Sequence, residues 1–357
     1  MANQQSTIKD VAALSGVSIA TVDRVLHNRG RVSPEKLKAV LAAIDQLSYR
    51  PNQIARALSV RKSNLKIGLT YPKIEDDFGV EIGEGIEAAK NKLLPFGVEL
   101  IVEHTYDYNF PDQVNSIKSL LNQGVNGLII NPVNDSSSQR IDQSIPNNIP
   151  FVTVIEDLIG SRRLLHIGPD DFRIGELAAK LVSLYSNDRC NVVILAPHST
   201  SNGTQQRISG FLSKAKKEIP QMNVLQVCAL PGDSEAEYDR NVYEMTLECI
   251  QNHSSIDFFY VTNGLTKRCA DAVTESEKPI MVFGHEFTKG IREHLESGVV
   301  GATIYQKPAQ QFYYAINLLF EILIGDRKVT KPVIVTECSI IMKESLPFIK
   351  VGMGNLI

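Results

Sequence analysis

Apolar residues recur at helical spacing in two short segments near the start of the chain, and a tight turn separates the segments. The first segment carries Ile8, Val11 and Ala12, and the second carries Thr21, Val22, Val25 and Leu26. Gly16 lies in the turn, where a left-handed backbone suits glycine, and Ser18 can cap the second helix. Two helices this short bury little surface, so the pattern predicts a third helix that covers them.

That third helix is predicted to begin at Ser33-Pro34, a capping serine followed by proline at the first helical position. Its apolar face carries Leu37, Val40, Leu41, Ile44 and Leu47. Pro51 ends the pattern, and a short segment over 53–58 follows. Two short helices under a third have the spacing of a helix-turn-helix, whose second helix enters the major groove of DNA.

From residue 65 onward, short apolar runs alternate with amphipathic helical stretches. The expected strands are 67–71, 98–104, 127–132, 149–155, 192–196, 224–230, 258–262 and 281–284. The expected helices are 82–94, 112–123, 173–185, 206–217, 235–252, 265–275 and 288–297. This alternation is typical of parallel sheets covered by helices on both faces. The stretch is too long to form a single sheet with its covering helices, so we expect an α/β body of two lobes.

Charge is divided unequally between these two parts. Residues 1–62 hold ten basic and four acidic residues, a net +6, while the remainder holds 27 basic and 36 acidic residues, a net −9. A basic head on an acidic body indicates that only the head meets a polyanion. We expect a cytoplasmic protein without a membrane partner, because no apolar run is long enough to span a bilayer and no signal-peptide core is present.

Motifs that could indicate nucleotide binding, metal binding or catalysis are weak in this sequence. The run from Gly83 to Ala88 matches GxGxxA but does not directly follow a strand, so we interpret its glycines as helix and packing residues. His285-Glu286 lacks the second histidine of a zinc protease, and the five cysteines have no metal-ligand spacing. We therefore assign no catalytic residue, metal or cofactor. An enzyme with an active site in the cleft remains an alternative.

The head resembles that of the LacI/GalR family of bacterial transcription regulators. The matching residues are Thr7-Ile8-Lys9-Asp10-Val11-Ala12, Ser15-Gly16-Val17-Ser18, Thr21-Val22, Arg24-Val25-Leu26, Tyr49-Arg50-Pro51-Asn52, Ala55-Arg56 and Leu58. The resemblance implies a helix-turn-helix domain over 1–50 and a hinge helix with linker over 51–64. Asp23 departs from the family's usual Ser near the DNA backbone. Its carboxylate must therefore point away from phosphate, pair with a base, or pair with Arg24 or another cation.

The resemblance assigns the base-edge positions to Ile19, Ala20 and Arg24. Arg24 can donate two hydrogen bonds to a guanine, and the other two offer apolar contact to a thymine methyl. The expected phosphate contacts are Thr7, Ser18, Thr21, Asn28 and Arg31, although Ser18 and Thr21 can also simply cap and pack the helix. The hinge positions are Asn52, Ala55, Arg56 and Leu58. Leu58 fits a minor-groove wedge, and a plain linker is the alternative.

The body resembles the type I periplasmic sugar-binding fold that this family carries as its effector domain. The supporting stretches are 127–132, Gly168 with Asp170, Asp171 and Gly175, then Arg207 with Gly210-Phe211, 261–264, 282–284 and 302–306. The implied effector-binding domain covers 65–357. Lobe 1 takes about 65–163 and 290–323, and lobe 2 takes about 164–289 and 324–345. The chain would cross between the lobes near 160–165, 286–292 and 322–330.

In such folds a small ligand lies between the lobes, at the carboxyl ends of the strands. The family's binding positions map onto Asp77, Phe78, Asn131, Asp170 or Asp171, Arg207, Asn263, Glu286 and Gln306. These types suit a sugar or sugar derivative, although each has an ordinary alternative: helix capping, an ion pair, core packing or a turn. Ile155 and Glu286 both replace the usual Asp, so the pocket differs from a standard ribose or galactose site.

These features predict a sequence-specific DNA-binding transcriptional regulator, expected to be a repressor. Two protomers would bind a pseudo-palindromic operator in double-stranded DNA as a homodimer, one recognition helix per half-site. A small polar, sugar-like effector between the lobes would control operator affinity. A sugar-binding or transport-type receptor is the alternative from another class, and the basic head argues against it.

Overall fold

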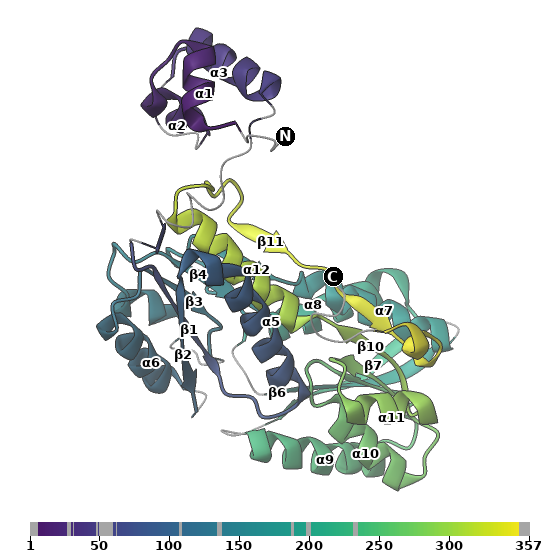
Figure 1. Cartoon of the computed structure of the whole chain (residues 1–357). Coiled ribbons are helices and arrows are strands. Elements are labelled where there is room, and N and C mark those ends of the chain that lie inside the picture. Colours follow the sequence, from purple (N-terminus) through teal and green to yellow (C-terminus); the bar gives the residue numbers. More distant parts are fainter. Residues whose placement is uncertain are drawn as a thin grey trace.

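The computed structural model describes residues 6–26, 30, 32–47, 49, 60–61, 63–106, 109–133, 138–186, 189–197, 201–230 and 235–349. A small three-helix head is followed by a larger α/β body (Figure 1). The predicted DNA contacts Asn28, Arg31, Asn52, Ala55, Arg56 and Leu58 lie outside the described residues. Within the described ranges, no helix is long and apolar enough to cross a membrane.

The head consists of α1 (Ile8–Ser15), α2 (Ile19–Leu26) and α3 (Pro34–Gln46). α1 begins at a capping box, because Asp10 Oδ2 accepts from the Thr7 amide at 2.7 Å while the Thr7 hydroxyl oxygen accepts from the Asp10 amide. Val11, Ala12, Val22, Val40 and Ala43 form the buried core, so the predicted covering helix is confirmed. Leu37 and Leu41 were expected on the buried face of α3. That expectation is wrong, because both are exposed.

The first lobe is built on a wholly parallel six-stranded sheet in the order β11-β5-β4-β3-β1-β2. Its strands are β1 (Lys66–Pro72), β2 (Glu99–Thr105), β3 (Gly127–Ile130), β4 (Phe151–Val154), β5 (Leu165–Gly168) and β11 (Val333–Val335). One face packs on α5 (Asp77–Leu93) and α12 (Pro308–Leu323), and the other on α6 (Phe110–Asn122). The glycines of the GxGxxA match lie inside α5, which confirms the helix assignment.

The second lobe repeats this plan, with the strand order β12-β10-β9-β8-β6-β7 and only β12 antiparallel to its neighbour. Its strands are β6 (Cys190–Pro197), β7 (Met222–Leu230), β8 (Phe258–Val261), β9 (Met281–His285), β10 (Val300–Tyr305) and β12 (Ser339–Ile341). One face carries α7 (Asp171–Ser186) and α8 (Asn202–Glu218). The other carries α9 (Glu235–Asn252), α10 (Thr266–Ser276) and α11 (Lys289–Ser297).

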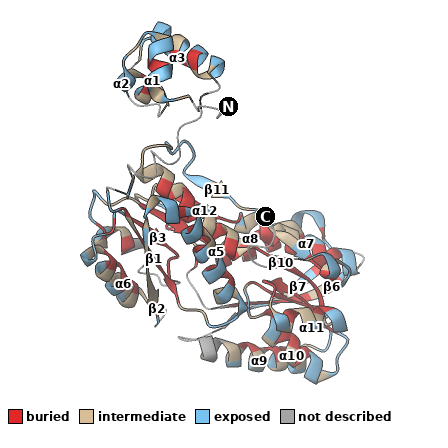
Figure 2. Ribbon diagram, viewed as in Figure 1, coloured by how far each residue is buried: buried red, intermediate tan, exposed pale blue. Residues whose placement is uncertain are grey.

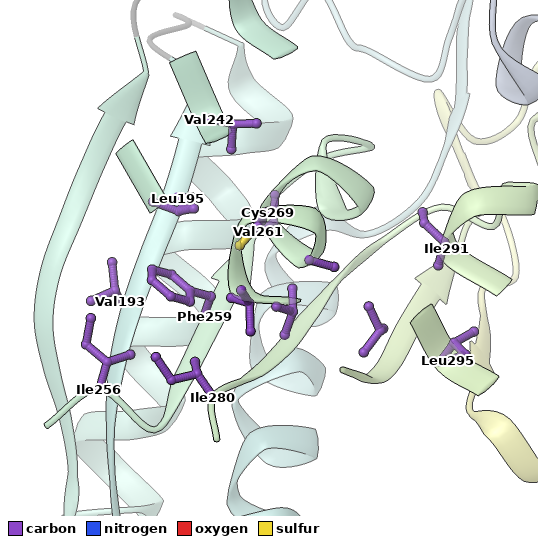
Figure 3. Close-up of a cluster of buried hydrophobic side chains, with 14 of the residues drawn as sticks. Val193, Leu195, Val242, Ile256, Phe259, Val261, Cys269, Ile280, Ile291 and Leu295 are labelled. Atoms are coloured by element: carbon purple, nitrogen blue, oxygen red, sulfur yellow. The ribbon is translucent and has the colours of Figure 1, made fainter. Parts of the chain in front are cut away.

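Buried side chains concentrate along both sheets (Figure 2). In the second lobe, Val193 of β6 and Phe259 of β8 face Cys269 of α10, with Ile291 and Leu295 of α11 continuing the same layer (Figure 3). Burying apolar side chains of this size stabilises the fold by roughly 1.5–3 kcal/mol each relative to exposure. These layers hold the carboxyl ends of the strands in fixed positions.

The chain crosses between the lobes three times, as predicted, but at different places. β5 belongs to the first sheet, so the first crossing lies between Gly168 and Asp171. α11 and β10 belong to the second lobe, so the second crossing lies between Tyr305 and Pro308. β11 pairs with β5 and β12 with β10, so the third falls at 336–338. The predicted lobe partition is therefore wrong for 165–168, 290–305 and 333–335.

Candidate DNA-binding surface and interlobe site

Helix α2, the predicted recognition helix, exposes its predicted base-reading residues. Ile19 is 46% exposed, and Ala20 and Arg24 are also exposed, whereas Val22 is fully buried in the head core. An exposed isoleucine beside an exposed guanidinium gives this helix one apolar contact and one bidentate donor. Those are the two kinds of group that read base edges in the major groove.

Ser18 and Thr21 form the amino end of α2. The Ser18 hydroxyl oxygen accepts from the Thr21 amide at 3.2 Å and lies 3.0 Å from the Thr21 hydroxyl. The capping role considered from the sequence is therefore present. Ser18 is exposed, and a helix amino end also favours a nearby anion. A phosphate contact at this end remains a prediction, as does one at the exposed Thr7.

The carboxyl ends of the two sheets meet across the seam between the lobes. The Lys289 amide donates to Asp77 Oδ2 at 2.6 Å, and the Tyr305 hydroxyl donates to the Glu81 carboxylate. A third contact joins the segment after β4 to the start of α8, where the Ser201 hydroxyl donates to Glu156 Oε1 at 3.0 Å. Each contact joins a residue of one lobe to a residue of the other, so the lobes are closed on each other.

Arg207 is held in the seam by α7 and α8. Its Nε donates to Asp171 Oδ1 at 2.7 Å, and its Nη1 donates to the Thr262 carbonyl at 2.8 Å. Only 7% of Arg207 is exposed. Burial lowers the pKa of Arg207, but the charges of Asp171, Tyr260 and Glu286, together with the hydrogen bond to Asp171, outweigh burial and the net shift is upward. Arg207 is therefore permanently charged and already neutralised by one carboxylate.

Glu286 and Gln306 follow β9 and β10 and form a second polar unit. Gln306 Nε2 donates to Glu286 Oε1, and both residues are at most 5% exposed. Glu286 Oε2 and Gln306 Oε1 have no hydrogen-bond partner among the described residues. Asn131 Oδ1, just after β3 in the first lobe, is also buried without a partner in the described ranges. Buried unpaired acceptors are costly, so these oxygens point to a missing donor.

The backbone at these strand ends is strained. Ile155 follows β4 with φ 65°, Glu286 follows β9 with φ 70°, and Lys307 comes shortly after β10 with φ 58°. Branched and charged residues avoid this left-handed region unless the surrounding structure imposes it. The strained residues therefore lie at the strand ends where the sequence predicts effector contacts.

Burial raises the pKa of several carboxyl groups here. The pKa of Glu286 rises to about 7, because burial outweighs the attraction of Arg207. Burial raises the pKa of Glu81 to about 8, even though the Tyr305 hydroxyl bond acts in the opposite direction. Burial, reinforced by Asp171, also raises the pKa of Glu156. At neutral pH, the carboxyl groups of the seam are therefore not all ionised.

A cavity of about 290 Å³ lies between α5 and the segment that begins α11. Its lining residues are Asp77, Val80, Glu81, Glu84, Phe287, Thr288, Lys289 and Arg292. Asp77 is the only residue of the predicted effector set in this lining. The cavity therefore lies at the edge of the seam, on the side where α5 meets α11.

Apart from Asp77, which accepts from the Lys289 amide across the seam, the predicted effector residues fall into two groups. Asp171, Arg207, Glu286, Gln306 and Asn131 supply the buried polar groups of the seam. The others make the ordinary local contacts considered from the sequence. Asp170 accepts from the Arg173 amide at 3.1 Å, Asn263 from the Leu265 amide at 3.4 Å, and Phe78 packs on the first-lobe core.

Sequence reasoning missed Glu81, Glu156, Ser201 and Tyr305, which join the lobes. The departure at Ile155 carried a usable signal for one of them. The position lacks the family's Asp, but the next residue is a carboxylate that reaches the opposite lobe.

Comparison with known proteins agrees with this two-part architecture. The family described as bacterial regulatory proteins, lacI family, matches residues 7–52, and the periplasmic binding protein domain matches 67–327. The HTH-type transcriptional regulator DegA of Bacillus subtilis (strain 168) is 30% identical over 58% of this chain and 60% of its own length. The ribose operon repressor of the same organism is 28% identical over 63% of this chain and 64% of its own length. The chain therefore spans less than two thirds of either relative.

Among solved structures, GanP, a glucose-galactose binding protein from Geobacillus stearothermophilus, superposes with a TM-score of 0.71. The match covers 79% of this chain and 99% of that protein at 22% identity. It shows a shared fold for the body.

Proposed function

This chain belongs to the lacI family of bacterial regulatory proteins, with a periplasmic binding protein domain as its body, and we propose that it is a sequence-specific transcriptional regulator. The observation that carries the proposal is the outward face of α2, where Ile19, Ala20 and Arg24 are exposed around the buried Val22. A basic head on an acidic body supports DNA as the partner of the head alone. As a DNA-binding protein, it is expected to act in the cytoplasm.

Two protomers bind one operator in this proposal. A single α2 reads only a few base pairs, so a homodimer on a pseudo-palindromic site supplies the needed specificity. The hinge segment over 51–64 joins each head to its body, and Leu58 enters the minor groove there. Repression follows from occupancy of the operator. The similarity to DegA, named a transcriptional regulator, and to the ribose operon repressor supports repression rather than activation.

A small polar molecule between the lobes controls this binding. The unpartnered oxygens of Asn131, Glu286 and Gln306 and the buried Arg207 support a ligand rich in hydrogen-bond donors, such as a sugar or sugar derivative. The body also shares its fold with a glucose-galactose binding protein. Ligand and operator act on one equilibrium of lobe orientation, so their affinities are reciprocally linked.

Selection of DNA from a random-sequence library by the full-length protein tests the proposal. We expect enrichment of one sequence with two half-sites related by a two-fold axis. Sedimentation of the complex should give two protomers per site. Recovery of unrelated sequences without a shared half-site would contradict the proposal for the head.

A further inference from the structure

The charges of the interlobe seam do not balance. Arg207 forms an ion pair with Asp171. Lys307 Nζ lies 3.6 Å from Oε2 of Glu337, a residue of the third crossing. Among the described residues, no cationic side chain lies within ion-pair distance of Glu156 or Glu286. Arg207 and Lys307 are therefore each paired with another acid, and Glu156 and Glu286 are two buried carboxyl groups left without a cation at ion-pair distance in the described part of the chain.

Of these two carboxyl groups, Glu286 has fewer hydrogen-bond donors around it. It is 5% exposed, and its Oε1 accepts from Gln306 while its Oε2 has no partner in the part of the chain that the structure describes. Glu156 differs, because the Ser201 hydroxyl and the Gly203 amide both donate to it. A buried carboxylate with a free oxygen is stabilised far more by a cationic N–H group than by a neutral hydroxyl.

Two other buried side-chain oxygens also favour a ligand that donates hydrogen bonds. Gln306 Oε1 belongs to the same hydrogen-bonded pair as Glu286, and Asn131 Oδ1 follows β3 in the opposite lobe. All three unpartnered atoms are acceptors, so they suit a group with several N–H or O–H bonds. An anionic ligand would instead bring negative charge next to Glu286 and Asp171, with Arg207 already shared. The seam therefore disfavours sugar acids and sugar phosphates.

We infer that the effector is an amine-bearing sugar or amino polyol whose protonated amino group binds at Glu286, with Gln306 and Asn131 as further acceptors. This inference rests on the proposed effector function of the seam. It narrows the ligand class from polar metabolites in general to cationic ones. Arg207 then serves mainly to orient Asp171 and the ligand hydroxyls.

The raised pKa of Glu286 agrees with a site that awaits a cation. Without a ligand, burial favours the protonated carboxyl group. A bound ammonium reverses this preference and draws the carboxylate form. Binding of an amine near neutral pH should therefore release protons from Glu286, whereas a neutral sugar should not.

Isothermal titration of the full-length protein with matched ligand pairs tests the inference. The pairs are glucosamine with glucose, galactosamine with galactose, and glucamine with sorbitol, and the anionic probes are gluconate and glucose 6-phosphate. We expect at least one amine to bind at least tenfold more tightly than its neutral partner, and the two anions to bind least. Heats measured in two buffers of different ionisation enthalpy should reveal proton release for the amine.

The variant Glu286→Gln should remove the amine preference, lowering the affinity for the amine at least tenfold more than the affinity for its neutral partner. Glu87→Gln, an exposed carboxylate of α5, serves as the matched control and should leave both affinities unchanged. Equal or tighter binding of neutral sugars, tighter binding of anions, or no binding by any amine would overturn the inference. None of these outcomes affects operator selection by the head. Failure of the amine inference can therefore be distinguished from failure of the proposed regulatory function.

Discussion

Gly175 of α7 lies directly against the backbone of Arg207 in α8. A Cβ placed on Gly175 would stand 2.0 Å from the Arg207 carbonyl oxygen, and one on Gly210 would stand 2.0 Å from the Phe172 carbonyl oxygen. The two helices can therefore approach this closely only with glycine at both positions. The approach sets Arg207 beside Asp171, so a packing requirement inside the second lobe determines the position of the buried cation.

Gly175→Ala should destabilise the second lobe, because the added methyl group meets backbone rather than a movable side chain. We expect a loss of about 1–3 kcal/mol in the free energy of unfolding, measured by urea denaturation. Gly83→Ala is the matched control, since Gly83 lies in α5 with no atom near its added Cβ. That control should stabilise by roughly 0.5–1 kcal/mol. A neutral Gly175→Ala would contradict the close-packing account.

The contributions of Glu286 and Glu81 to folding stability should fall as pH rises through the neutral range. The folded-state pKa values of Glu286 and Glu81 are raised from 4.5 to about 7 and about 8. Between the unfolded and folded values the native state binds more protons, so raising the pH disfavours it. The slope approaches about 1.4 kcal/mol per pH unit for each group. Urea denaturation at a series of pH values measures it in the ligand-free protein.

Glu286→Gln should flatten this pH dependence between about pH 4.5 and 7, and Glu81→Gln should do so up to about pH 8. Glu87→Gln again provides the control, because its side chain is exposed. If both buried variants kept the wild-type slope, these carboxyl groups would not carry the effect.

Asp23→Ser should strengthen DNA binding. The family resemblance sets this position near the DNA backbone, where a carboxylate opposes phosphate and a hydroxyl can donate to it. We expect a several-fold lower Kd for operator and unrelated DNA alike, measured by fluorescence anisotropy. Asp45→Ser, on the exposed side of α3, should change neither Kd by a comparable factor. A Kd for Asp23→Ser that is unchanged or higher would mean that the carboxylate does not oppose binding.

Arg24→Ala should lower sequence preference as well as affinity. Loss of a bidentate contact to guanine costs about 1–3 kcal/mol, so operator affinity should fall roughly ten- to a hundredfold. Affinity for unrelated DNA should fall much less. Arg173→Ala, an exposed arginine of the body, is the control for the loss of one positive charge. If the ratio of operator to unrelated affinity survives in Arg24→Ala, another residue reads the base.

The head and most strands were predictable because their signals are local. Val11, Val22 and Val40 show the helical period in the sequence and meet in one core. The later elements were harder to predict. α12 buries residues such as Phe312, Ile316 and Asn317 on several sides, which blurs its period. β11 and β12 have three residues each, and their partners lie far away in the sequence.

The candidate site was predicted only in part for a related reason. Asp171, Arg207, Glu286 and Gln306 occupy strand or helix ends that a family pattern can identify. Glu156 and Tyr305 act across the seam, and their partners Ser201 and Glu81 lie 45 and 224 positions away. Contacts between lobes depend on where the chain crosses, and the crossings were misplaced.

The central claim is that one protein couples operator binding by α2 to ligand binding in the seam. The most direct test measures operator Kd with and without the tightest ligand of the titration series, and ligand Kd with and without operator. The account predicts that both Kd values change by the same factor, at least about fivefold. A factor of one in both titrations would contradict it.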